Sequence, residues 1–383
     1  MNRVAGTLAC LALGLLAAGC SGPLLANAVP SVRPMATSAP PTPGRMPDPQ
    51  PVSLPADDAP HDRLTEWWYY TGHLDSADGE RFGFELVTFR AERGRFPVAW
   101  AAHFAVTDET GGRFLYDQRA EVGAQVDRSS PGVGFDLSIA GDVVPGVRAT
   151  VPAWRMAGSE GSHQLEAPSG RAASGAAFGL SLRLDDGSRK VLLHDGDGWV
   201  DFGPAGGSYY YSRPRMAAQG SLTLDGEVIP VTGSAWFDHQ WGDFISVGGG
   251  WDWFAVNLDD GTDVTISTVR DPLGGVGLVY GTLRDAEGDR HISRDEISLE
   301  TLGAWTSPRT GIDWPAGWRL ELAEESLIIE LRPTLADQEL DTRPTTGVIY
   351  WEGSQEVSAT RDGLPVGGRA YVELTGDAPG AEE

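Results

Sequence analysis

The stretch EWWYYTGHL at residues 66–74 decides the fold class, because four aromatic residues in succession are followed by threonine and then by a turn sequence, SADG, at residues 76–79. Aromatic and β-branched residues favour strands, and an Asp-Gly turn after such a run favours an antiparallel hairpin. A second extended segment, residues 82–90, follows the turn at hairpin spacing. The folded part of the chain therefore begins with two antiparallel strands.

The same pattern of short apolar runs and turn residues continues to residue 375. The whole chain has fifty glycines and twenty-six prolines, and no long segment has helical periodicity. This favours an all-β protein built from antiparallel barrels or sandwiches over a doubly wound α/β enzyme. The further segments expected to be extended are residues 101–107, 178–184, 190–194, 251–258, 263–269, 277–284, 318–322, 327–331 and 370–375.

Two barrels in tandem fit the length better than one, because residues 61–376 exceed what a single small barrel organises around one core. The boundary is expected near residues 242–250, where glycines separate WGDF from the aromatic segment that starts at Trp251. We therefore predict an N-terminal domain at residues 61–243, a C-terminal domain at residues 244–376 and a disordered tail at residues 377–383.

Residues 1–20 read as a lipoprotein signal peptide, because a basic start precedes an apolar stretch too short to span a bilayer. It ends in LAAGC, so Cys20 is the predicted lipidation site, with an ordinary cleaved secretory signal as the alternative. Residues 21–60 are rich in Pro, Ala and Ser and are expected to form a disordered tether. Membrane contact is expected through the Cys20 lipid.

Composition narrows the classes of partner and the compartment. The net charge of −25 argues against binding to nucleic acid, because an acidic surface repels phosphate backbones. The two cysteines are Cys10, inside the signal, and Cys20, so disulfides and thiolate chemistry are not expected in the folded body. We expect a lipid-anchored protein of the cell envelope that faces the periplasm or the exterior, with Ser21 after the anchor favouring the outer membrane.

The common hydrolase and phosphate-binding motifs are absent, and seven histidines are scattered without metal-ligand spacing, so neither a metal nor another cofactor is predicted. The densest mixture of polar and aromatic residues is WFDHQWG at residues 236–242. Strand alternation places Trp236, Asp238 and Gln240 on one face, and it places His239 and Trp241 on the other, so at least one polar group faces inward. This indicates either a ligand pocket or a hydrogen-bonded core network.

Two further clusters carry candidate functional groups. The first contains Trp67, Trp68, Tyr70 and His73, which either bind a ligand or plug the first barrel. The second is Asp252, which lies between two tryptophans. A carboxyl group in apolar surroundings keeps its proton to a higher pH and so could act as a general acid, whereas a turn or salt-bridge role is the alternative.

These clusters, in this order, resemble the carotenoid 1,2-hydratase-like family of tandem lipocalin-type proteins, also called the AttH/CrtC type. The resemblance covers residues 61–376. It rests on residues 66–74, FAVTD at 104–108, WFDHQWG at 236–242, WDWF at 251–254, YWEG at 350–353 and GGRAYVELTG at 367–376.

The resemblance implies two calycin-like or lipocalin-like barrels. We consider three possible functions, of which the resemblance implies the first two. The leading one is binding of an apolar lipid or isoprenoid-like molecule near the junction of the barrels. The second is hydration of an alkene, with Asp252, His239 and Trp241 as catalytic residues. The third is service as an accessory to a membrane transporter. The residues expected to bind the ligand are Asp238, Gln240, Trp236, Trp253, Trp67, Trp68, Tyr70 and His73.

Overall fold

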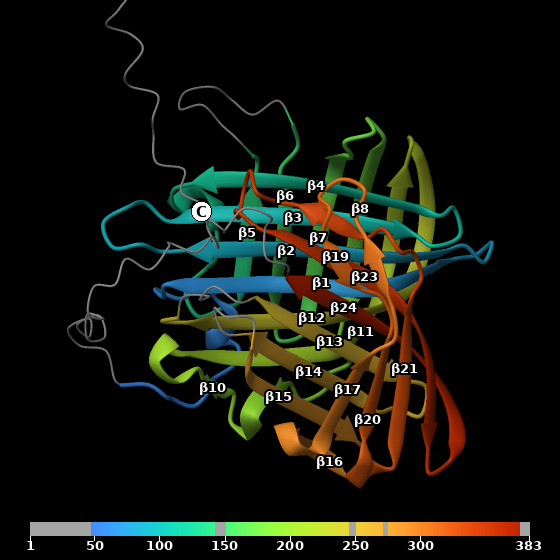
Figure 1. Ribbon diagram of the computed structural model, residues 1–383. Helices are drawn as coiled ribbons and strands as arrows, with labels where there is room; N and C mark the ends of the chain where they lie inside the picture. Colours follow the sequence, from blue (N-terminus) through green and yellow to red (C-terminus); the bar gives the residue numbers. More distant parts are fainter. Residues whose placement is uncertain (1–46, 142–150, 245–249, 271–274, 376–383) are drawn as a thin grey trace, which may run out of the picture.

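The protein is all-β, as predicted, and consists of two large antiparallel sheets that pack against each other (Figure 1). The computed structural model describes residues 47–141, 151–244, 250–270 and 275–375. The predicted signal peptide, Cys20, the first part of the tether and the C-terminal tail lie outside these residues. Within them the helices are short 3-10 turns, and none is long and apolar enough to cross a membrane.

The first sheet has the strand order β4-β3-β2-β1-β12-β11-β8-β7-β6-β5, with β9 and β10 added beside β11. It curls until its edge strands meet, where the Arg119 guanidinium of β4 donates to the backbone oxygen of Ile139 in β5 at 3.4 Å. The sheet therefore nearly closes into a barrel. Its strands are β1 (Thr65–Ser76), β2 (Arg81–Ala91), β3 (Ala99–Asp108), β4 (Arg113–Val122), β5 (Phe135–Ile139), β6 (Trp154–Ser159), β7 (Ser162–Arg171), β8 (Ala177–Asp185), β9 (Leu192–Leu193), β10 (Trp199–Asp201), β11 (Gly207–Leu224) and β12 (Glu227–Gly242).

The second sheet has the order β16-β15-β14-β13-β24-β23-β21-β20-β17, with β22 beside β23, and a separate hairpin pairs β18 with β19. Its strands are β13 (Trp251–Leu258), β14 (Asp263–Arg270), β15 (Val276–Asp285), β16 (Gly288–Ile292), β17 (Ile297–Thr301), β18 (Ala304–Thr306), β19 (Asp313–Pro315), β20 (Trp318–Leu322), β21 (Leu327–Pro333), β22 (Glu339–Asp341), β23 (Ile349–Arg361) and β24 (Leu364–Thr375). The 3-10 turns are η1 (Ala56–Asp58), η2 (Ala124–Val126), η3 (His194–Gly196), η4 (Gly203–Ala205), η5 (Arg294–Glu296) and η6 (Ala323–Glu325).

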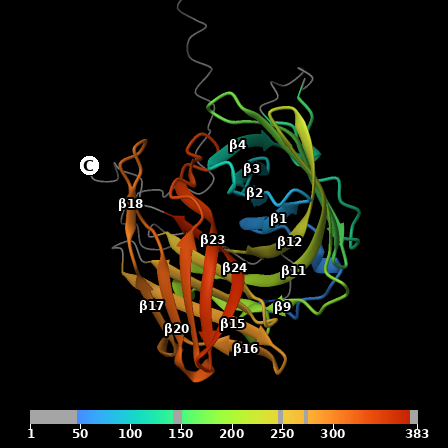
Figure 2. The same cartoon turned by 90° about the vertical axis from the view of Figure 1, so that its right-hand side faces the viewer.

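The central strands of the first sheet are buried on both faces. Trp68 and Tyr70 of β1 point into the core inside the first sheet, whereas Tyr69 joins a different cluster that includes Trp253 of the second sheet. The view in Figure 2 shows the first sheet curving away from the second, with β12 and β24 between their cores. One face of β1 therefore packs in the core inside the first sheet, and its other face lies at the junction between the two sheets.

The junction requires a close approach of backbone at Gly83 in β2. A Cβ atom at this position would lie 2.6 Å from the Tyr371 hydroxyl of β24 and 3.0 Å from the Ser354 Cβ of β23. A side chain here would push the sheets apart. The glycine is thus one of the places where the sequence permits the two sheets to touch.

The predicted tether is wrong for residues 47–60, which pack on the first sheet. Val52 and Leu54 contact its core, and Asp58 in η1 is fully buried. The Tyr211 hydroxyl donates to the Asp58 carboxylate, and the Arg213 guanidinium lies 3.7 Å from it. Proline-rich composition suggested a spacer, but apolar contacts and hydrogen bonds, including those of Asp48 and Gln50 with Tyr209, hold the segment against the first sheet.

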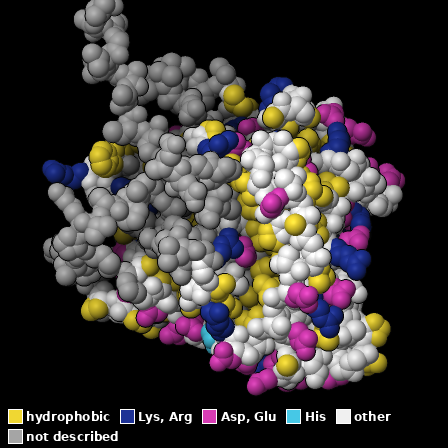
Figure 3. All heavy atoms as spheres, in the orientation of Figure 1, with side chains coloured by type: hydrophobic (Ala, Val, Ile, Leu, Met, Phe, Trp, Pro, Cys, Tyr) yellow, Lys and Arg dark blue, Asp and Glu magenta, His cyan; other side chains and the backbone are white. Residues whose placement is uncertain are grey.

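The predicted strands match the structure except at residues 190–194, where two residues, Leu192–Leu193, form β9 and η3 follows. About half of the strands were not predicted, among them β4 to β7, β11 and β23. In the long strand β11, serines, glycine and proline weaken the strand pattern. On the face drawn in Figure 3, acidic side chains are interspersed with basic ones and do not form a single block.

We expect Asp58→Ala to lower the free energy of unfolding by about 3 kcal/mol, because it leaves the buried Tyr211 hydroxyl without its acceptor and removes one of the two acids beside the buried Arg213 guanidinium. Urea denaturation followed by tryptophan fluorescence measures the change. Asp62→Ala is the control: its side chain is fully exposed, and the expected change is within about 0.5 kcal/mol. Equal effects from the two substitutions would contradict the docking of residues 47–60.

Candidate ligand cavity between the two sheets

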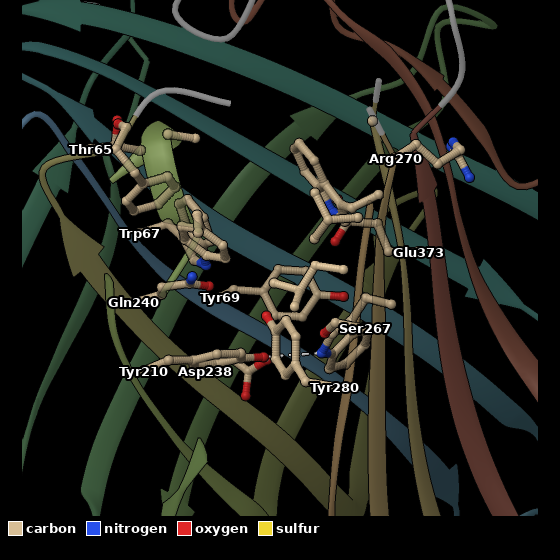
Figure 4. A pocket seen from close by; sticks show the side chains of 18 of the residues that line it. Thr65, Trp67, Tyr69, Tyr210, Asp238, Gln240, Ser267, Arg270, Tyr280 and Glu373 are labelled. Carbon is tan, nitrogen blue, oxygen red and sulfur yellow. Dashed lines mark hydrogen bonds between the residues drawn. The ribbon is translucent and has the colours of Figure 1, made fainter. Parts of the chain in front are cut away.

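A cavity of about 510 Å³ lies where the two sheets meet, and strands of both sheets supply its walls. Figure 4 shows Trp67, Asp238 and Tyr210 from the first sheet, and Tyr280 and Glu373 from the second, around the same space. This volume suits a drug-sized ligand. The aromatic residues that line it are Trp67, Tyr69, Phe89, Phe202, Tyr210, Phe244, Trp251, Trp253 and Tyr280.

Asp238 of β12 is the most heavily hydrogen-bonded acid in the cavity. It accepts from the Tyr210 hydroxyl at 2.5 Å, from the Trp236 indole Nε1 at 2.6 Å and from the Ser212 hydroxyl. Burial raises the pKa of Asp238 to about 6, although these three donors act in the opposite direction. The carboxyl is therefore mostly ionised at neutral pH and held in one orientation.

Two glutamates in the cavity have pKa values above that of Asp238. Burial raises the pKa of Glu373 on β24 to about 7, although a hydrogen bond from Trp251 acts to lower it. Burial and the charge of Glu373 raise the pKa of Glu85 on β2 to about 8. A hydrogen bond from Tyr350 acts in the opposite direction. At neutral pH the cavity thus contains a mostly ionised acid, Asp238, a mostly protonated acid, Glu85, and a third acid, Glu373, that is about half protonated.

The wall behind Glu85 is a polar network that crosses the junction. The Tyr350 hydroxyl of β23 donates to Glu85 Oε1 at 2.8 Å and contacts His103 Nδ1 of β3 at 2.8 Å. Beside it, the Tyr69 hydroxyl donates to Glu352 Oε1 at 2.8 Å. Burial and the charges of Glu85 and Glu373 raise the pKa of Glu352 well above its usual value.

A second polar cluster lies inside the first sheet, away from the cavity. Glu66 Oε1 is 2.7 Å from His61 Nδ1 and 2.9 Å from His239 Nε2. The two imidazole rings stack on Trp241 and Trp68, respectively. Burial opposes protonation of His61, but Glu66 and Asp57 overcome it and raise the pKa of His61 to about 9.

These three residues are the group within the described ranges that could hold a metal ion, since their ligand atoms lie within 4.8 Å of one another. However, both ring nitrogens lie at hydrogen-bond distance from the same carboxylate oxygen. A charge-assisted hydrogen-bond cluster accounts for this geometry. The spacing of the histidines in the sequence did not reveal the grouping, because it depends on the pairing of β1 with β12.

The profile of the AttH-like family matches residues 45–377. The chain belongs to the AttH-like family. A solved structure of an AttH protein from Nitrosomonas europaea is 31% identical, with a TM-score of 0.72, and the match covers 88% of this chain and 99% of that one. Kievitone hydratase from Nectria haematococca shares the fold at 17% identity and a TM-score of 0.61, covering 85% of this chain and 93% of that one. No curated protein matches the chain.

In this AttH-like protein, strand alternation separates the predicted site residues into two groups. Trp67, Asp238, Gln240 and Trp253 line the cavity, and Trp236 contacts Asp238. Trp68, Tyr70, His239 and Trp241 lie in the core inside the first sheet. His73 faces the junction, 3.9 Å from Glu109, but does not line the cavity.

Asp252 points away from the cavity, on the opposite face of β13 from Trp253. Its carboxylate forms an ion pair with Arg270 at 2.6 Å and accepts from the Thr268 hydroxyl at 3.3 Å. Burial raises the pKa of Asp252, although Arg270 acts against this. The salt-bridge role, which the sequence left open, is the one that this geometry favours.

Sequence reasoning did not select Glu85, Glu373 or Tyr210 as site residues. Glu85 and Glu373 are acids at positions of strands whose two faces are both buried. An acid inside such a strand is a usable signal, because a buried carboxyl group requires a partner or a function. The pairing across two sheets that brings them to Asp238 has no local sequence signal.

We expect the stabilising effect of His61 to depend on pH. Its raised pKa means that the folded state binds the proton more tightly, so its contribution is complete below about 6.5 and is lost as the pH rises through about 9. His61→Gln should therefore destabilise the protein at pH 6 much more than at pH 10. Urea midpoints of the two proteins across this range measure the difference, and a constant difference would contradict the assignment.

Proposed function

We propose that the protein binds an apolar small molecule in the cavity between its two sheets. The observation that carries the proposal is the lining: nine aromatic side chains surround the space, and a few polar groups converge on it. Such a combination binds through burial of apolar area and selects through a small number of hydrogen bonds. A small barrel otherwise fills its interior with side chains, as the first sheet does here.

Binding at this cavity is tested by narrowing it. Leu278→Trp, at a half-buried lining position on β15, should weaken binding of an uncharged solvatochromic dye such as Nile red by about tenfold, or about 1.4 kcal/mol. Leu364→Trp is the matched control because Leu364 is 69% exposed at a hairpin end. Equal dye affinity in the two variants would place binding elsewhere. Native mass spectrometry of the purified protein then identifies any co-purified molecule.

Hydration of an alkene is the second candidate, favoured by the unequal acids of the cavity. A protonated glutamate and an ionised aspartate facing one apolar space form an acid and base pair. Glu373 would protonate the alkene carbon, and the resulting carbocation would be stabilised by the faces of the surrounding rings. A water molecule would add to the cation and give a proton to Asp238. Asp238 would then release that proton to solvent and Glu373 would take one up, so the net change is addition of one water to the alkene.

The hydration mechanism replaces Asp252 with Glu373 as the acid. With an alkene substrate found by screening, Glu373→Gln and Asp238→Asn should each lower kcat by about a hundredfold or more. The wild-type rate should rise through pH 6, as Asp238 ionises, and fall above pH 7, as Glu373 loses its proton. A loss of turnover in Asp252→Asn together with an active Glu373→Gln variant would contradict the assignment.

We also propose that the protein acts in the cell envelope, held by lipid on Cys20. The support is the LAAGC sequence at residues 16–20. Residues 21–46 would then separate the anchor from the segment that packs on the first sheet. Metabolic labelling with a radioactive fatty acid tests this directly, since Cys20→Ala should abolish the label and release the protein from membranes.

A further inference from the structure

We infer that the junction cavity prefers a lipophilic organic cation, such as a quaternary ammonium compound, over the uncharged molecule of the same shape. The inference rests on the proposed function, since it concerns the same cavity, and it adds the charge of the ligand. Its basis is the number and placement of acidic and aromatic groups around the space.

The first observation is an imbalance of charge-bearing groups in the lining. Two buried acids, Glu85 and Asp238, line the cavity together with the half-buried Glu373 and with Asp201. Arg270 is the basic residue in the lining, and its guanidinium is bound to Asp252 at 2.6 Å and to the backbone oxygen of Thr375. A ligand with a positive charge would therefore meet acids inside the cavity and little opposing charge.

The second observation is an oxygen of Glu85 that has no hydrogen-bond partner. Glu85 is 1% exposed, and its Oε1 accepts from the Tyr350 hydroxyl at 2.8 Å. Its Oε2 is fully buried and, within the described residues, has no hydrogen-bond partner. Because no donor among the described residues compensates this oxygen, the ionised carboxylate can interact with a positive charge that the ligand brings, including that of an ammonium group without an N–H donor.

The third observation is the set of aromatic rings that line the same cavity as Glu85. Phe89 is four residues further along the same strand, and Trp67 packs edge-on against it with ring centroids 6.4 Å apart. Tyr69 packs against Trp253 with centroids 5.2 Å apart. Ring faces attract alkylammonium groups, and they do so more strongly where water is excluded.

The groups facing Glu85 permit it to change its protonation state on binding. Tyr350 donates to it and favours the ionised form, whereas the charges of Glu373 and Glu352 disfavour that form. His103, behind Tyr350, adds no positive charge, because burial lowers its pKa to about 3. Thr71 of β1 and Tyr69 on the same strand are uncharged. A bound cation would displace the Glu85 proton to solvent and leave a carboxylate beside the ammonium group.

The test compares benzyltrimethylammonium with neopentylbenzene, in which carbon replaces the charged nitrogen. In titrations at pH 9, we expect the cation to bind about ten- to thirtyfold more tightly than the hydrocarbon. Below pH 8 this preference should fall by up to about tenfold per pH unit, because the Glu85 proton must first be removed. Calorimetry at pH 7 in two buffers of different ionisation enthalpy should detect release of a proton.

Glu85→Gln is the deciding variant, and it should bring the ratio of the two affinities close to one and abolish proton release. Glu300→Gln, on an exposed part of β17, makes the same change in charge and should retain the wild-type ratio. Tyr350→Phe provides a second variant: removal of its hydrogen bond raises the pKa of Glu85, so the preference for the cation should appear at a higher pH.

The outcomes separate this inference from the proposed function. If the hydrocarbon binds and the cation binds no more tightly at pH 9, the inference is overturned and the apolar cavity stands. If the preference persists in Glu85→Gln, the assignment to Glu85 is overturned. If neither compound binds and Leu278→Trp also leaves dye binding unchanged, the proposed function itself fails.

Discussion

The structure depends on burial of both faces of the central strands. β1 and β12 of the first sheet and β13 and β24 of the second have one face in a core and one at the junction. A strand in this position cannot direct its polar side chains into water. Every acid on its outer face must therefore find a hydrogen bond, an opposite charge or a proton.

The cavity shows the consequence of that constraint. Asp238 obtains three donors and keeps a pKa of about 6, whereas Glu373 and Glu85 have fewer partners and higher pKa values. Desolvation raises the pKa of all three acids. The number of hydrogen-bond donors, which lower the pKa, accounts for much of the difference between them. A set of acids with graded proton affinity in one apolar space is useful both for proton transfer and for binding a cation.

The polar cluster inside the first sheet also contains a buried acid, but there the acid is compensated by histidines. There Glu66 is paired with His61 and His239, whose interactions lower the pKa of Glu66 against the effect of burial. The pair stabilises the fold and is separated from the cavity by the β1–β12 layer. Neighbouring residues of WFDHQWG thus serve two different environments, which explains why one short motif looked like a single site.

Motifs along the chain indicated the family, and local sequence patterns established the all-β class, about half of the strands and the alternation of residues 236–242. These properties depend on local composition and on side-chain periodicity, which can be read along the chain. The tertiary structure alone decided that residues 47–60 pack on the first sheet, that Asp252 pairs with Arg270, and that Glu85, Asp238 and Glu373 share a cavity. The reason is physical: those contacts join strands of two sheets that are far apart in the chain, and the protonation of a buried acid is set by all the groups that surround it.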